Sequence, residues 1–356
     1  MAGAHPKESR RPRAANHAPR GRLCRGLTMV ELLVTITILA ITAALLLPSL
    51  GAARESARRT ACLNNLSQIG KSIMSYDSSQ NYLPGWRMAL PGFTELSGQC
   101  VSWSVAILPF LGEREIFDGY ESYANAPAGL AEVQSKRLPR YVCPTVLTRV
   151  SPNAPLTYVG NAGTGAETLN GSQQWRGDGV FFDMVGSAGS YDPMTTSVAR
   201  IADRDGASST MLLTERGGIH APLQASWAHA PGPAAANANA VLTTHAVLHP
   251  PTAALVSGRP PIGRRIVNPT LETTISANAD WPFRFPSSMH DGGAAVAFCD
   301  GRTQFMSEQV APWVYCQTLT SDRRTESPRA AAWEVYPSGA SWTRYVFDER
   351  DLTPKQ

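Results

Sequence analysis

Charged residues are scarce in this chain. Asp, Glu, Lys and Arg make up 17% of it and hydrophobic residues 43%, and residues 217–258 contain no charged residue. This balance excludes a disordered chain and a charge-driven coiled coil. The sequence also lacks G-x-S-x-G, P-loop and C-x-x-C motifs. It therefore indicates no enzyme, and we expect no cofactor and no metal ligand set.

Basic residues are concentrated at the N-terminus. The first 26 residues carry seven Lys or Arg and one acidic residue, although the whole chain has a net charge of only +4. The remainder is therefore slightly acidic, and the basic sequence pI does not indicate a nucleic-acid partner. We read residues 1–26 as a cytoplasmic basic leader.

A long apolar run follows the leader. Residues 27–47 contain a single charge, Glu31, and as a helix they would span about 31 Å, close to the thickness of a bilayer core. The preceding cations place the N-terminus inside and everything after Pro48 outside the cytoplasmic membrane. The sequence thus predicts a single-pass protein in contact with the lipid bilayer.

Three interpretations of this segment compete. A cleaved signal peptide could end at residues 51–53, but the apolar run is too long for one. An uncleaved anchor fits the length and leaves Glu31 unexplained. The third rests on residues 25–33, Arg-Gly-Leu-Thr-Met-Val-Glu-Leu-Leu, which resemble the leader of type IV pilins and pseudopilins.

The pilin resemblance implies specific processing. A prepilin peptidase/methylase would cut between Gly26 and Leu27 and methylate the new amine of Leu27. Glu31 would serve assembly with other pilin-like subunits, because it can pair with a terminal amine one helical turn away. Pro48 would kink the helix.

The rest of the chain predicts an α+β, pilin-like fold. A helix over 27–80 presents an apolar stripe through its second half, which we expect to pack on a sheet; the stripe comprises Cys62, Leu66, Ile69, Ile73 and Tyr76. Residues 81–326 form an extracytoplasmic, antiparallel β-rich domain with an irregular insertion at 217–285, followed by an extension at 327–356. A short helix is expected at 113–120, and 101–108 is a strand or a short helix. Apolar runs predict strands at 140–143, 157–159, 179–182, 210–214, 294–299 and 303–305.

The segment 288–301 contains His290, nine intervening residues and then Asp300-Gly301. Asp-Gly predicts a type I′ hairpin turn. The segment resembles the bacterial prepilin-type family with a C-terminal H-X9-DG element, whose large domain has no assigned biochemical function. We favour a structural role for His290, Asp300 and Gly301, with His290 bonded to a backbone carbonyl; a cation site and catalysis are the alternatives.

Five cysteines remain once the leader is removed. At most two disulfides can form, and their connectivity is open. The family resemblance marks Cys62, Cys143 and Cys299 as the candidate disulfide cysteines.

Two classes of function follow. The first is a pilin- or pseudopilin-like structural or assembly subunit, located in the membrane or at the cell surface. The second is a membrane-anchored binding module that uses the leader only for sorting.

Overall fold

In the computed structural model the chain divides into two compact units, 1–53 and 54–356. The described residues are 28–89, 100–123, 132–133, 135–146, 155–163, 179–185, 193–217, 227, 246–247, 286–310 and 312–322. The leader 1–26, Leu27, most of the insertion 217–285 and the extension 327–356 lie outside them.

Helix α1 (Met29–Gln80) confirms the expected long N-terminal helix and includes Pro48. The residue that follows the helix accounts for its C-terminal end. Asn81 adopts a left-handed conformation with φ of 63°, and its N–H donates to the Asp77 carbonyl at 2.7 Å. Asn is one of the few non-glycine residues that accept this conformation at a helix end.

The sheet has the strand order β3-β1-β2-β4-β5. Its bounds are β1 (Tyr158–Asn161), β2 (Met211–Glu215), β3 (Ala246–Val247), β4 (Gly293–Phe298) and β5 (Thr303–Ser307). Strands β1, β2, β4 and β5 pair antiparallel, as predicted, and β3 adds a short parallel edge on β1. Strands β1, β2 and β4 are buried along their whole length.

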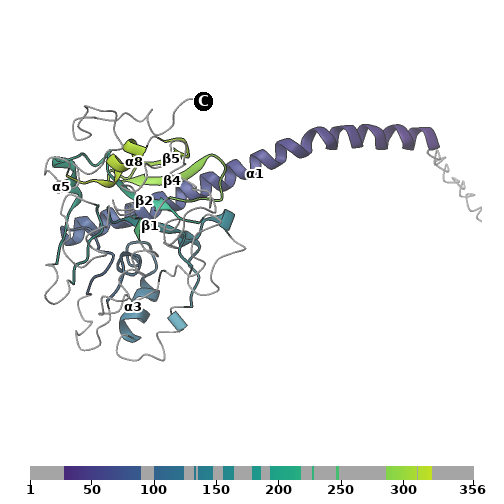
Figure 1. The fold of residues 1–356 in the computed structure, drawn as a ribbon. Coiled ribbons are helices and arrows are strands. Elements are labelled where there is room, and N and C mark those ends of the chain that lie inside the picture. The colour runs from purple at the N-terminus through teal and green to yellow at the C-terminus, as the bar shows by residue number, and fades with distance from the viewer. Residues whose placement is uncertain are drawn as a thin grey trace, which may run out of the picture. The chain divides into compact units, whose positions relative to one another are not determined.

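The second half of α1 packs on this sheet. The predicted stripe from Cys62 to Tyr76 is buried, and Figure 1 shows this part of α1 alongside the strands. At Gly70 a Cβ would lie 3.9 Å from Ala297 on β4 and Leu212 on β2. Small residues on both elements let the helix approach the sheet closely, which positions the site described below.

Short helices and aromatic residues complete the core. The helices are α2 (Trp103–Ala106), α3 (Arg114–Tyr123), η2 (Pro139–Tyr141), η3 (Pro144–Val146), α5 (Val198–Asp203) and α8 (Pro312–Leu319). Trp227, from the insertion, is fully buried and its indole N–H donates to the Lys136 carbonyl at 2.9 Å. The insertion therefore contributes to the core, which its irregular sequence did not indicate.

Residues 101–108 contain helix α2, which is the second of the two alternatives predicted for this segment. Two strand predictions need correction. The strand expected at 140–143 is wrong, because Pro139 begins a 3₁₀ turn there. Residues 179–182 are not a strand either; Gly179 has φ of 90°, and the neighbouring Asp183 makes only an isolated bridge.

The β4–β5 turn also differs from the type I′ prediction. Gly301 has φ of 85°, whereas Asp300 does not have a positive φ. The Gly301 N–H donates to the Phe298 carbonyl at 3.0 Å, and the Phe298 N–H donates to the Arg302 carbonyl at 2.9 Å. This pattern fits a three-residue hairpin loop in which glycine alone takes the left-handed position.

Candidate functional site

The first candidate site is the start of α1. The Thr28 backbone N–H and hydroxyl donate to Glu31 Oε2 at 2.9 and 2.8 Å, and the Glu31 N–H donates to the Thr28 hydroxyl at 3.2 Å. This reciprocal pair is a capping box, which satisfies N–H groups that the first helical turn leaves open. Glu31 thus has a local role that the sequence interpretation overlooked. Gly26 and Leu27 lie outside the described residues.

The N-terminal part of α1 is long and apolar enough to cross a membrane. Its large side chains are exposed, among them Leu39 and Leu45, which are 66% and 74% exposed. Hydrophobic surface of this extent marks a membrane or protein contact.

The second candidate site lies where the second half of α1 meets the sheet. Cys62 on α1 forms a disulfide with Cys143, which lies between η2 and η3. Both cysteines are fully buried. The Cys143 N–H donates to the Thr157 hydroxyl at 2.7 Å, and the Tyr158 hydroxyl donates to the Cys62 carbonyl at 3.4 Å. These contacts hold the Cys62 backbone against β1 and the Cys143 backbone against the residue that precedes that strand.

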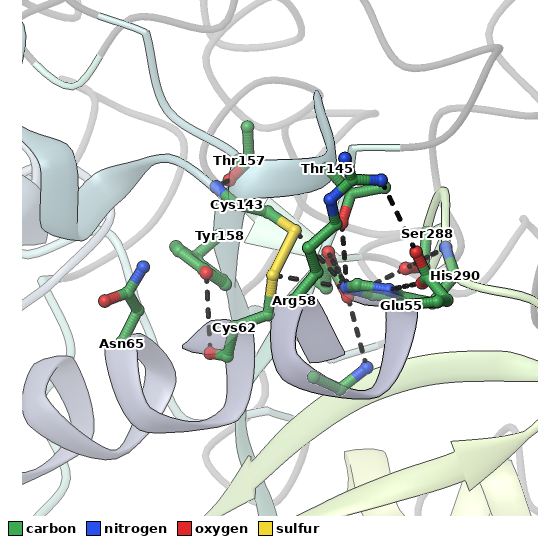
Figure 2. A network of polar contacts seen from close by, with 12 residues as sticks. Glu55, Arg58, Cys62, Asn65, Cys143, Thr145, Thr157, Tyr158, Ser288 and His290 are labelled. Carbon is green, nitrogen blue, oxygen red and sulfur yellow. Dashed lines mark hydrogen bonds and ion pairs between the residues drawn. A yellow bond between two sulfur atoms is a disulfide. The ribbon is translucent and has the colours of Figure 1, made fainter. Parts of the chain in front are cut away.

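His290 lies against this disulfide (Figure 2). Its Nε2 is 3.2 Å from Cys62 Sγ and 3.4 Å from Cys143 Sγ, with the Thr145 hydroxyl at 3.5 Å. Its Nδ1 is 2.5 Å from Glu55 Oε1. A carboxylate only accepts hydrogen bonds, so Nδ1 carries the proton and Nε2 faces the sulfurs. The predicted bond from His290 to a backbone carbonyl is wrong.

Glu215, the last residue of β2, completes the group. Its Oε1 is 3.8 Å from His290 Nε2, and its Oε2 accepts from the Ser288 hydroxyl at 2.9 Å. The side chain is fully buried, and Oε1 has no hydrogen-bond partner among the described residues. The pKa of the Glu215 carboxyl is raised, chiefly because burial disfavours its charged form, while His290 acts in the opposite direction.

We call Cys62, Cys143, Glu215 and His290 the buried cluster. One ligand atom from each lies within 4.8 Å of the others, an arrangement able to hold a metal ion. The four residues come from four distant parts of the chain, and Glu55 contacts the cluster from outside with a side chain that is 36% exposed.

Asp300 and Cys299 do not join the buried cluster. Both lie at the turn after β4, whereas His290 precedes that strand. Asp300 accepts from the Arg302 N–H at 2.9 Å. Cys299 is a buried thiol that forms no disulfide with a described residue, and burial raises its pKa, which disfavours the reactive thiolate. The structure thus separates the two ends of the H-X9-DG segment.

Sequence reasoning missed Glu55 and Glu215. Glu215 ends an apolar strand, where an acid is unusual, and this was the available signal. Glu55 lies in an Arg-rich stretch and gave no signal.

Comparison with protein-family models gives two matches. Residues 21–47 match the model described as Prokaryotic N-terminal methylation motif. Residues 51–312, most of the chain, match the model described as Protein of unknown function (DUF1559). The chain belongs to the DUF1559 family.

The DUF1559 chain therefore combines a prepilin-type N-terminus with a large C-terminal domain. It is a pilin-like, membrane-anchored protein, and the motif implies processing by a prepilin peptidase and association with pilin-like subunits in general. No curated protein and no solved structure matches it.

Proposed function

We propose that this DUF1559 protein is a pilin- or pseudopilin-like structural or assembly subunit rather than an enzyme. It is cut between Gly26 and Leu27, methylated on Leu27, and exposes its C-terminal domain outside the cytoplasmic membrane. One observation carries the proposal: the methylation motif at 21–47 coincides with the exposed apolar start of α1. The cationic leader supports the orientation.

The exposed apolar start of α1 is suited both to a membrane and to an assembly of subunits. In the membrane it contacts lipid, and in an assembly the same side chains can pack against those of neighbouring subunits. The terminal amine freed on Leu27 lies one helical turn before Glu31, within reach of that carboxylate in the same or a neighbouring subunit.

Processing is the sharpest test. The intact mass of full-length protein extracted from membranes should correspond to a chain that begins at Leu27 with one added methyl group. Gly26→Val should leave the precursor uncut, because a β-branched side chain blocks close approach by the peptidase. Gly51→Val is the matched control, since a Cβ at Gly51 meets no atom within 4 Å, and it should be processed normally.

The other interpretations give different masses. A chain that begins at Arg54 would show a cleaved signal peptide, and an uncut wild type would show a plain anchor; either contradicts the proposal. Shearing surface filaments from cells, together with cross-linking, then distinguishes an assembly subunit from a sorting-only binding module. Protein in sheared filaments or in cross-linked complexes with pilin-like subunits supports assembly, whereas correctly cleaved protein without such partners supports the sorting-only binding module.

A further inference from the structure

The buried cluster has the composition of a zinc site. Two thiolates, one imidazole and one carboxylate are ligands that Zn²⁺ accepts in tetrahedral geometry. Ca²⁺ and Mg²⁺ prefer oxygen ligands. We propose that Cys62, Cys143, Glu215 and His290 bind one Zn²⁺ ion when the two cysteines are reduced, and that the Cys62–Cys143 disulfide is the oxidised, metal-free form of the same centre.

The distances fit this assignment. Ligand atoms around a tetrahedral Zn²⁺ lie about 3.3–3.8 Å apart, given the usual bond lengths. His290 Nε2 lies 3.2 and 3.4 Å from the two sulfurs and 3.8 Å from Glu215 Oε1. All four ligand atoms lie within 4.8 Å of one another, and breaking the disulfide lets the two sulfurs separate to the spacing that a tetrahedral ion requires.

The surroundings also match a metal centre. A histidine that binds a metal usually donates its other ring N–H to a carboxylate, a backbone carbonyl or a water, and Glu55 Oε1 lies 2.5 Å from His290 Nδ1. The Ser288 hydroxyl donates to Glu215 Oε2. Oε1, which faces His290 Nε2, is buried and has no hydrogen-bond partner in the part of the chain that the structure describes. A buried carboxylate oxygen requires a compensating partner, and a cation supplies one.

The two forms interconvert by a balanced step. A dithiol supplies two electrons and two protons, the S–S bond breaks into two thiols, and the dithiol becomes a disulfide. Zn²⁺ then displaces both thiol protons into solvent and forms bonds to two sulfurs, His290 Nε2 and a Glu215 oxygen. In either form the centre joins α1 to the segment at Cys143; with zinc it also joins β2 and the start of β4.

Metal uptake by the full-length protein in detergent tests the proposal. The protein is reduced with a phosphine, which becomes its oxide, and is then equilibrated with Zn²⁺, dialysed and analysed for metal. The expected result is about one Zn²⁺ per reduced chain and none on the oxidised chain. Co²⁺ on the reduced chain should give a sulfur-to-metal charge-transfer band and the visible spectrum of a tetrahedral ion.

Variants locate the ion. Glu215→Gln and His290→Ala should each abolish stoichiometric binding. Glu55→Gln alters a side chain outside the cluster and should weaken Zn²⁺ affinity about 10–100-fold without changing the stoichiometry. Cys299→Ala is the matched control, because it removes another buried thiol and should leave binding intact.

Three results would overturn the proposal: a reduced wild type that takes up no zinc, uptake that does not depend on reduction, or unchanged binding by His290→Ala. Because the wild-type measurements alone decide the first two, a variant that fails to fold does not leave the question open. The result is also independent of leader cleavage, so it stands apart from the proposed function.

Discussion

The Cys62–Cys143 disulfide should be a major source of stability for the C-terminal domain. It joins α1 to the segment before η3 across a sequence separation of 81 residues. The perturbation we choose is the double variant Cys62→Ala/Cys143→Ala, which removes the bond without leaving an unpaired thiol. Cys100→Ala/Cys299→Ala is the matched control, because it also removes two buried sulfurs but no bond between them.

The expected magnitude follows from chain entropy. Closing a loop of 81 residues lowers the entropy of the unfolded chain, which raises the free energy of unfolding by about 4.5 kcal/mol at 25 °C. Both variants lose comparable packing around a small buried side chain, so the difference between them isolates the bond. Against a total stability of about 5–15 kcal/mol, the loss would leave the domain marginal.

Urea unfolding of the full-length protein in detergent measures the effect. Fluorescence of the buried Trp86 and Trp103 reports loss of the core, and EDTA is present throughout so that reduced cysteines take up no metal. Treating wild type with a phosphine should lower its stability by about the difference between the two variants, because reduction removes the bond and keeps both side chains. The phosphine should not affect Cys62→Ala/Cys143→Ala.

A reduced wild type that is as stable as the oxidised protein would refute this reasoning. So would a Cys100→Ala/Cys299→Ala variant that loses as much stability as Cys62→Ala/Cys143→Ala, because the effect would then come from packing.

Three further predictions concern single positions. Gly301→Val should cost about 1–3 kcal/mol in chemical unfolding, since φ is 85° and a Cβ would lie 3.1 Å from Met74 Sδ; Gly301→Asn should cost less, and an equal loss would contradict the turn assignment. Arg87→Leu should lower the stability by about 3–5 kcal/mol because it removes the charge partner of Asp183, whose carboxylate lies 2.6 Å from Arg87 in a buried pair. Adding Asp183→Leu should recover part of that loss, and no recovery would show that packing dominates. Glu31→Ala should retain leader cleavage but reduce Leu27 methylation and assembly, as read by intact mass and cross-linking; a Thr28→Ala chain that fails equally would assign the defect to the lost helix cap.

Local patterns predicted much of the fold. The stripe from Cys62 to Tyr76 and the hairpin of β4 and β5 were predicted correctly, because each depends on residues close together in the chain. The predictions at 140–143 and 179–182 were wrong because apolar runs do not separate strands from buried irregular segments. The turn at Asp300-Gly301 was misassigned because Asp-Gly fits more than one hairpin loop.

The sequence by itself determined the membrane-anchored, pilin-like class of this protein. A cationic leader, an apolar run of bilayer length and an acid at its start carry that information within 50 residues. Only the tertiary structure decided the buried cluster, because Cys62 and His290 are 228 residues apart and Cys143 and His290 are 147 apart. Such contacts depend on where along the sheet α1 docks, and the local pattern that predicted its apolar stripe does not specify that position.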